Sequence, residues 1–330
     1  MSDLQKTIHY TTKAQEICAN LIKYIPNEAN LIEPFVGDGD LLSLFPNHQW
    51  EKYDIEDKGY NIVQDTLATP PSYENKWVIT NPPYLAKNKA SNKSIFSQYG
   101  VDDLYIATLL SILSCEGGIL IIPTNFLTDE RTGNVRTQFL NQFEILEMNI
   151  FTEPVVISTS YSVCSFAFKR KANNKIPQTF AVNINPAHET VNITIYPDYD
   201  YRIAGEFYNA LTSTHNIFGR LVGSTSTDYN TNIKLYALDT RTERIRVEYE
   251  PNHYEGKDSD RTYATFTCKK TLTEEQEKFL IQEFNKQIEA FRKAYYDLSM
   301  TNYRDYNRKR IGFTFAYQLL SKIYNETYSS

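Results

Sequence analysis

Residues 77–84 read Trp77-Val78-Ile79-Thr80-Asn81-Pro82-Pro83-Tyr84, an apolar run followed at once by a polar and aromatic tetrapeptide. The run is typical of a buried strand, which must end at Asn81 because the two prolines cannot donate ladder hydrogen bonds. In α/β folds the chemistry is usually placed at such strand ends. An amide, a prolyl carbonyl and an aromatic ring can hold a flat heterocycle that carries an amino group. Taken alone, the tetrapeptide could also be an ordinary loop.

A glycine-bearing turn follows an earlier apolar run at 31–35, and residues 33–39 read Glu-Pro-Phe-Val-Gly-Asp-Gly. Its glycines allow a tight turn and close approach of the backbone to a ligand. A phosphate loop is excluded because Gly-Lys-Ser/Thr is missing and the aspartates would repel phosphate. The acidic turn favours a cationic ligand, such as the sulfonium and amino groups of S-adenosylmethionine; a purely structural turn is the alternative.

Two spaced aspartates follow the next apolar runs. Asp54 ends the run at 50–55, about 20 residues after the first strand, where a carboxylate can accept both ribose hydroxyls of a nucleoside. Asp65 follows the short run at 60–63 and could accept a hydrogen bond from an adenine amino group. Each could be a surface residue if it stood alone. In this order, together with the turn and the tetrapeptide, they predict a nucleoside site.

Apolar runs alternate with helical patterns along the first 170 residues, which predicts an α/β fold with a parallel, doubly wound, Rossmann-like sheet. Beyond residue 170 the sequence changes to short β-branched runs, and then to a helical segment at 273–300 with a capping box at Thr273 to Gln276. We therefore expect two domains, 1–170 and 171–330, the second of α+β class. The elements expected in the first are helices at 13–24, 41–44, 103–113 and 135–143, and strands at 31–35, 50–55, 60–63, 77–80, 119–122, 145–151 and 161–168.

Composition limits the classes of protein that the chain can belong to. No apolar run is long enough for a membrane span, and the N-terminus is no signal peptide. Four separated cysteines and five histidines show no metal-binding spacing, which predicts a metal-free protein of a reducing, cytoplasmic compartment. The net charge of −6 is unusual for a nucleic-acid binder; residues 1–170 carry −7 and residues 171–330 carry +1.

This ordered set of motifs resembles the γ-group of DNA adenine-N6 methyltransferases, which use S-adenosylmethionine and occur in restriction–modification systems. The similarity covers about residues 6–170: Tyr10-Thr11-Thr12, the turn at 33–39, Asp54, Asp65, the tetrapeptide at 81–84 and, more weakly, residues 123–127 and 158–166. The resemblance implies that residues 1–170 form the catalytic methyltransferase domain. It implies that residues 171–330 form a target-recognition region.

Site residues are carried over by position. The resemblance assigns cofactor contacts to Tyr10, Thr12, Glu33, Pro34, Gly37, Asp38, Gly39, Asp54, Ile55, Asp65 and Thr66. It assigns catalysis on the target base to Asn81, Pro82, Pro83 and Tyr84. Stacking on a flipped base is expected from Tyr84, Phe151 or Tyr161. Two departures stand out: Lys13 replaces a proline that often follows this threonine, and Val156 lies where many relatives carry a stacking phenylalanine.

Double-stranded DNA is the expected partner of a monomeric enzyme, with a cognate restriction endonuclease acting separately. Phosphate contacts would come from basic residues in the second half, for which a solvated charged face is the alternative. The candidates are Arg304, Arg308, Lys309, Arg310, Arg241 and Arg244.

Other reactions remain open at this stage. The sequence argues against carbon-5 cytosine methylation, because that reaction needs a nucleophilic cysteine, usually after a proline, and no cysteine here follows a proline. N4-cytosine methylation uses the same amine chemistry, although Ser-Pro-Pro is commoner there. Ribosomal RNA and protein glutamine are modified by relatives with the same tetrapeptide, and an inactive DNA-binding methyltransferase fold is the non-enzymatic alternative.

Overall fold

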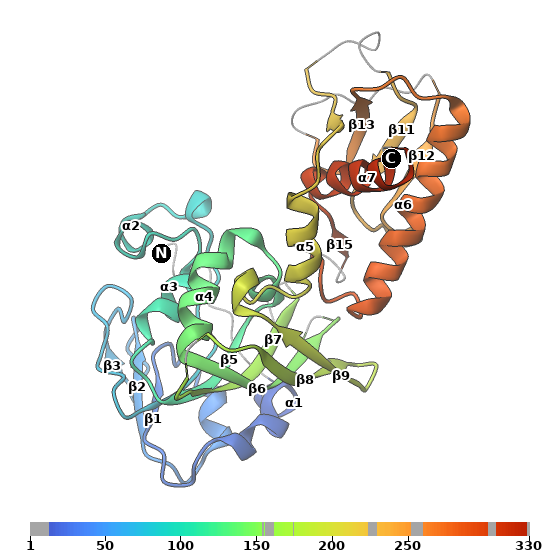
Figure 1. The fold of residues 1–330 in the computed structure, drawn as a ribbon. Coiled ribbons are helices and arrows are strands. Elements are labelled where there is room, and N and C mark those ends of the chain that lie inside the picture. The colour runs from blue at the N-terminus through green and yellow to red at the C-terminus, as the bar shows by residue number, and fades with distance from the viewer. Residues whose placement is uncertain are drawn as a thin grey trace. The chain divides into compact units, whose positions relative to one another are not determined.

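The structure is a computed structural model that describes residues 13–153, 155, 162–173, 175–223, 230–251, 260–302 and 308–328. The chain divides into two compact units, Met1–Arg202 and Ile203–Ser330. Figure 1 shows the elements of both. None of the helices in these described ranges is both long and apolar enough to cross a membrane.

The first unit is built on one nine-stranded sheet. Its strands are β1 (Leu31–Glu33), β2 (Trp50–Asp54), β3 (Ile62–Val63), β4 (Trp77–Thr80), β5 (Gly117–Pro123), β6 (Phe143–Phe151), β7 (Val163–Arg170), β8 (Gln178–Asn185) and β9 (Glu189–Ile195). Its α-helices are α1 (Ala14–Cys18), α2 (Ser94–Tyr99), α3 (Leu104–Ser111) and α4 (Gly133–Gln142). Its 3₁₀ helices are η2 (Ala19–Tyr24), η3 (Asp40–Leu44), η4 (Lys87–Lys89), η5 (Thr124–Leu127), η6 (Glu130–Thr132) and η7 (Pro197–Tyr199).

The strand order is β3-β2-β1-β4-β5-β7-β6-β8-β9, and the first five strands are parallel. This part has the 3-2-1-4-5 order of a doubly wound sheet, in which the order of the strands reverses between β1 and β4. The predicted α/β class is thus confirmed. The sheet is mixed rather than parallel, because β7 runs antiparallel to both β5 and β6 and β9 antiparallel to β8.

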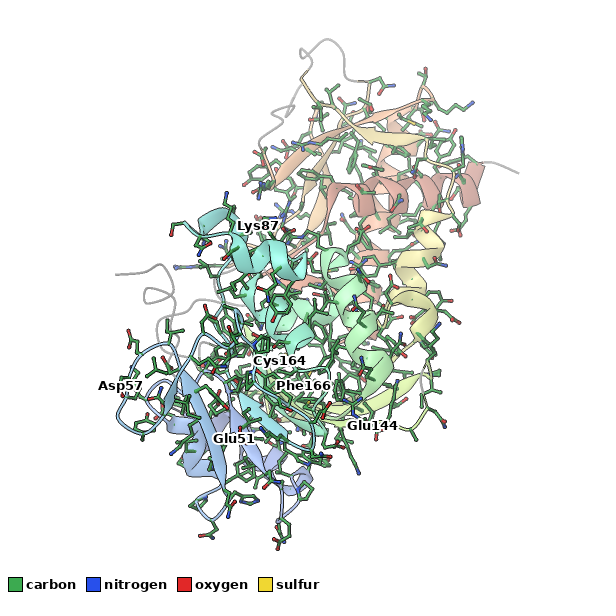
Figure 2. All side chains as sticks on the ribbon, turned by 90° about the vertical axis from the view of Figure 1, so that its left-hand side faces the viewer. Glu51, Asp57, Lys87, Glu144, Cys164 and Phe166 are labelled. Atoms are coloured by element: carbon green, nitrogen blue, oxygen red, sulfur yellow. The ribbon has the colours of Figure 1, made fainter. Side chains whose placement is uncertain are left out.

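Helices cover both faces of this sheet. On one face, α4 packs on β6 and β7 through a cluster of phenylalanine rings, and on the other face the carbonyl of Ile17 in α1 accepts hydrogen bonds from Asn149 (3.0 Å) and Ser165 (2.6 Å). Figure 1 shows α1 on one side and α3 and α4 on the other, and Figure 2 shows Cys164 and Phe166 inside the unit. The ring cluster consists of Phe126, Phe139, Phe143, Phe166 and Phe168.

The first unit ends at Arg202, beyond the boundary expected at residue 170. The physical reason is the pairing of β8, which runs parallel to β6 from Glu147↔Ala181 to Phe151↔Asn185, while β9 closes the edge as an antiparallel neighbour. The alternation of apolar and polar residues in β8 predicts a strand, but it does not show whether that strand belongs to the first sheet or to a separate β region. Only the long-range pairing places it in the first sheet.

The second unit is of α+β class. Its strands β10 (Phe218–Arg220), β11 (Ile233–Tyr236), β12 (Arg246–Tyr249) and β13 (Tyr263–Cys268) form an antiparallel sheet of order β10-β13-β11-β12, and β14 (Thr301–Asn302) pairs with β15 (Lys309–Arg310). Its helices are α5 (Gly205–Thr212), α6 (Glu274–Ala294) and α7 (Phe313–Tyr328). The capping box expected at Thr273 and Gln276 is present at the start of α6.

Gly118 fixes the contact of β5 with β4. A Cβ atom there would lie 1.8 Å from the carbonyl oxygen of Val78, on a backbone that cannot move within the buried sheet. We expect Gly118→Ala to lower the free energy of unfolding by about 3 kcal/mol or more, because overpacking a rigid core forces backbone shifts. Urea unfolding measures the change. Gly133→Ala is the matched control, since its Cβ meets only ordinary contacts, and an equal loss there would contradict the explanation.

Candidate functional site

The predicted site lies where parallel strands β1, β2 and β4 end next to one another. β1 pairs with β2 on one side and with β4 on the other, so Glu33, Asp54 and Thr80 end three neighbouring strands. The switch between β1 and β4 is the place where open α/β sheets bind ligands. The sheet therefore brings the acidic turn at 33–39 and the tetrapeptide at 81–84 to one edge.

Asp54 holds the glycine turn. Its Oδ2 accepts a hydrogen bond from the backbone N–H of Gly37 at 2.9 Å, and its Oδ1 accepts one from the N–H of Glu56 at 2.9 Å. The carboxylate is buried, with an exposed fraction of 6%. These bonds fix the turn, and each oxygen keeps a second lone pair that can accept from a ligand.

Gly37 and Gly39 both have positive φ angles, 51° and 83°, which a side chain would strain. Tyr60 covers the turn and donates its hydroxyl to the carbonyl of Gly37 at 2.8 Å. A Cβ atom on residue 39 would lie 3.1 Å from that hydroxyl, which is tighter than ordinary packing. Asp38, between the glycines, is exposed, and Lys58 lies 3.9 Å from its carboxylate.

Asp65 and Thr66 lie beside the same turn. The hydroxyl of Thr66 is buried and donates to the carbonyl of Pro34 at 3.0 Å, which joins the segment after β3 to the segment after β1. Asp65 Oδ1 accepts from the N–H groups of Leu67 and Ala68 at 3.1 and 3.0 Å. The carboxylate thus orders its own turn at the edge of the site, and Ile55, after β2, is half-buried.

Glu33 is the most unusual group of the site. It is 1% exposed; its Oε1 accepts from Thr80 Oγ1 at 2.5 Å and from the N–H of Phe35 at 3.1 Å. Its Oε2 is buried and has no hydrogen-bond partner among the described residues. Burial raises the pKa of Glu33 to about 8, which the two hydrogen bonds only partly offset and the nearby Asp54 carboxylate reinforces.

Asn81 and Tyr84 of the tetrapeptide interact directly. The hydroxyl of Tyr84 lies 2.5 Å from Asn81 Oδ1 and 2.7 Å from the carbonyl of Ile121 in β5, so its one proton is shared between two acceptors. Asn81 is 8% exposed, Tyr84 is 5% exposed, and the Tyr84 ring meets Tyr105 edge to face. Pro82 is buried and Pro83 half-buried. The tyrosine therefore orients the amide, and little of its ring is open to a ligand.

Two other predicted residues, Phe151 and Lys309, are buried. Phe151 is 3% exposed in the core at the end of β6, and its stacking on a base stays a prediction. Lys309 was expected on a DNA-binding surface but is 3% exposed, and its ammonium donates to Asn302 Oδ1 at 2.5 Å; burial lowers its pKa to about 8. Pairing of β15 with β14 turns it inward.

The remaining basic candidates lie at the surface of the second unit. Arg241 is exposed, and Arg308 and Arg310 are half-buried. Arg244 lies 3.7 Å from Asp297 and 3.9 Å from Glu289, so carboxylates lie near its charge. Four further predictions fall outside the described residues: Tyr10, Thr12, Tyr161 and Arg304.

Three residues that the sequence did not single out contribute to the site. Tyr60 covers the glycine turn, and Thr80 connects Glu33 to the tetrapeptide that it precedes. Asp103 begins α3 beside the tetrapeptide, since the N–H of Leu104 donates to the carbonyl of Leu85 at 3.1 Å. Burial raises the pKa of Asp103 to about 7. None has a local sequence signal, because each acts through pairing with a distant segment.

Among the described residues, no three His, Cys, Asp or Glu side chains cluster in a way that could hold a metal ion. All four cysteines are buried free thiols, and burial raises the pKa of Cys18, Cys115 and Cys164 to about 12. Such thiols are poor nucleophiles and metal ligands.

No protein-family profile and no curated protein sequence matches this chain. Solved structures resemble it distantly. One is a type I restriction-modification methyltransferase subunit from Streptococcus thermophilus, with 14% identity and a TM-score of 0.44 over 60% of this chain and 59% of that one. Another is the type IIG restriction endonuclease BpuSI, with 14% identity and a TM-score of 0.41 over 67% of this chain and 37% of that one. A third is the 23S rRNA methyltransferase ErmE, with 13% identity and a TM-score of 0.34 over 47% and 68%. This likeness is too distant to assign a family or a function.

Proposed function

We propose that this protein is an S-adenosylmethionine-dependent methyltransferase that acts on the N6 amino group of adenine in double-stranded DNA. The observation that carries the proposal is the arrangement at the sheet edge. An acidic glycine turn and the tetrapeptide Asn-Pro-Pro-Tyr end neighbouring strands β1 and β4, and the Thr80–Glu33 hydrogen bond joins them. One part suits a cationic nucleoside, and the other suits an amine on a heterocycle.

The residues at the turn fit the cofactor. Glu33 Oε2 is a buried acceptor without a partner, which an ammonium or sulfonium group would satisfy. Gly37 and Gly39 have positive φ angles that favour glycine, and neither carries a side chain that would stand between the backbone and a ligand. The carboxylates of Asp54 and Asp65 keep lone pairs for ribose hydroxyls and an adenine amine. Bound there, S-adenosylmethionine would supply the methyl group.

The tetrapeptide would prepare the amine that accepts the methyl group. The nitrogen of an exocyclic amine is a weak nucleophile, because its lone pair is delocalised into the ring. Hydrogen bonds from the amine to Asn81 Oδ1 and to the carbonyl of Pro82 would favour a pyramidal nitrogen with a localised lone pair. Tyr84 would hold the Asn81 amide in place, so the acceptor is positioned before the substrate arrives. Stacking of Tyr84 on the base stays a prediction.

Adenine in duplex DNA must leave the base stack to reach a buried pocket. We propose that residues 1–202 perform the chemistry, and that the second unit, an α+β unit with exposed Arg241, recognises the DNA sequence. The preference for adenine over cytosine follows from Asn rather than Ser before the two prolines. The setting of a restriction–modification system, with a separate endonuclease, belongs to the same proposal.

Methyl transfer from labelled S-adenosylmethionine to unmethylated duplex DNA tests the function, with the modified base identified by mass spectrometry. We expect N6-methyladenine. N4-methylcytosine would keep the reaction but change the base. Transfer only to RNA or to protein glutamine would overturn the DNA assignment, and cofactor binding without any product would support an inactive binding fold.

A further inference from the structure

The segment that follows the tetrapeptide is basic and rich in hydrogen-bond donors. Residues 85–94, here named the lysine loop, read Leu-Ala-Lys-Asn-Lys-Ala-Ser-Asn-Lys-Ser, with lysines at 87, 89 and 93. Between Glu74 and Asp102 the sequence contains no acidic residue, although the chain has 40 in total. Asn, Ser and Lys side chains are among those that contact nucleic-acid phosphates in proteins.

The lysine loop is fixed beside the tetrapeptide by backbone hydrogen bonds. The N–H of Lys87 donates to the carbonyl of Asp102 at 2.8 Å, and the N–H of Leu104 donates to the carbonyl of Leu85 at 3.1 Å. Leu85 and Ala90 are buried, with exposed fractions of 6% and 8%, so the loop is held by its apolar residues. The backbone that carries the lysines is therefore anchored next to the tetrapeptide.

The charges of this loop are available to a ligand. Lys89 and Lys93 are exposed and Lys87 is half-buried, and Figure 2 shows Lys87 at the surface of the first unit. Across the described ranges, no ion pair or hydrogen bond joins the ammonium group of any of the three to another residue; the carbonyl of Lys93 accepts from the Ser97 hydroxyl at 3.2 Å. Two acidic residues, Asp102 and Asp103, adjoin the loop backbone, and Lys89 lowers the pKa of Asp103 slightly against the larger effect of burial.

Arg244 and Arg246, which lie just before and at the start of β12 in the second unit, differ in this respect. Arg246 forms ion pairs with Glu243 at 3.1 Å and with Glu248, and Arg244 has carboxylates of Asp297 and Glu289 within 4 Å. Phosphate binding at those positions would have to compete with existing carboxylate partners. At the lysine loop no ion pair among the described residues would have to be broken, so less of the gain from releasing DNA counterions is offset.

Resting on the proposed function, we propose that the lysine loop binds the backbone phosphates of the DNA strand that carries the target adenine, next to the flipped nucleotide. Extruding a base distorts the backbone at that nucleotide, and cations fixed beside the pocket would stabilise the distorted strand. In a chain of net charge −6, a local positive surface at the reaction site also opposes repulsion of the polyanion. The loop positions the strand and reads no bases.

Salt dependence of DNA binding tests the inference. The variant Lys89→Gln/Lys93→Gln removes the two exposed charges of the lysine loop, neither of which belongs to a catalytic residue. The double variant Lys169→Gln/Lys175→Gln is the matched control. Lys169 pairs with Gly117, where β5 begins, and so lies at the opposite end of the strands. Duplex affinity would be measured against salt concentration for wild type and both variants, with S-adenosylmethionine affinity measured in parallel.

We expect the slope of log affinity against log salt to fall by about 2 in the lysine-loop variant and to stay unchanged in the control. Affinity at low salt should drop by about tenfold or more, with cofactor affinity retained. A wild-type slope in the lysine-loop variant would overturn the inference and leave the proposed function standing. Failure of the wild-type protein to bind duplex DNA, while it binds cofactor or RNA, would overturn both.

Discussion

Asn81→Ala is expected to lower the rate of methyl transfer by about 10²- to 10³-fold while the protein stays folded and binds S-adenosylmethionine as wild type does. The lost oxygen is a fixed acceptor aimed at the amine, and removing one such preorganised group typically costs this much. Folding should survive, because the hydroxyl of Tyr84 keeps the carbonyl of Ile121 as an acceptor at 2.7 Å.

Asn81→Asp separates loss of the acceptor from loss of packing. It keeps an oxygen of similar position, so it should retain more activity than Asn81→Ala if accepting a hydrogen bond is the role of Asn81. Single-turnover rates at saturating cofactor, with cofactor affinity from calorimetry, make the comparison. Activity of Asn81→Ala within a few-fold of wild type would contradict the catalytic assignment, and a parallel loss of cofactor affinity in both variants would indicate a structural role.

Local patterns predicted the strand ends that form the site. Asn81 was identifiable because the prolines stop β4, and Asp54 because an apolar run ends there. What those patterns could not supply is the Thr80–Glu33 hydrogen bond, which depends on the parallel register of β1 with β4. For the same reason Tyr60 and Asp103 gave no signal, since each meets the site through a segment that is distant in sequence.

Charge patterns misled where pairing decides which side a residue faces. In the sequence, Lys309 is one of a run of basic residues. In the structure, β15 pairs with β14, and the backbone N–H of Lys309 donates to the buried Asp239 at 3.2 Å. Arg292 holds the same carboxylate in a bidentate pair at 2.8 and 2.9 Å, so this end of the run is part of the core. Lys89 and Lys93, which have no acidic neighbour in sequence, are by contrast exposed.

Glu33→Gln is expected to weaken binding of S-adenosylmethionine by about 10- to 100-fold, because a charge-assisted hydrogen bond to a buried carboxylate contributes roughly 1.5–3 kcal/mol. A cation beside Oε2 favours the ionised form of Glu33, whose pKa is about 8 without ligand. Binding at pH 7 should therefore release about one proton from wild type and none from this variant. Calorimetry in buffers of different ionisation enthalpy measures that number, with Glu74→Gln, an exposed acid beyond the site, as the control.

Glu33→Gln should weaken cofactor binding but stabilise the fold at neutral and higher pH. Glu33 ionises near 4.5 in the unfolded chain but only near 8 in the native protein, so between these values the native state holds a proton that the unfolded state has lost. This residue therefore makes the free energy of unfolding fall as pH rises, by up to about 1.4 kcal/mol per pH unit across that window. Glu33→Gln removes this slope and should gain stability relative to wild type as pH approaches 8. Urea unfolding from pH 5 to pH 8 measures the free energy of unfolding of both proteins. If Glu33 is a buried acid kept for binding, Glu33→Gln will bind the cofactor more weakly and its stability will depend less on pH. Equal destabilisation of the variant at every pH, with unchanged cofactor affinity, would show that Glu33 serves only packing.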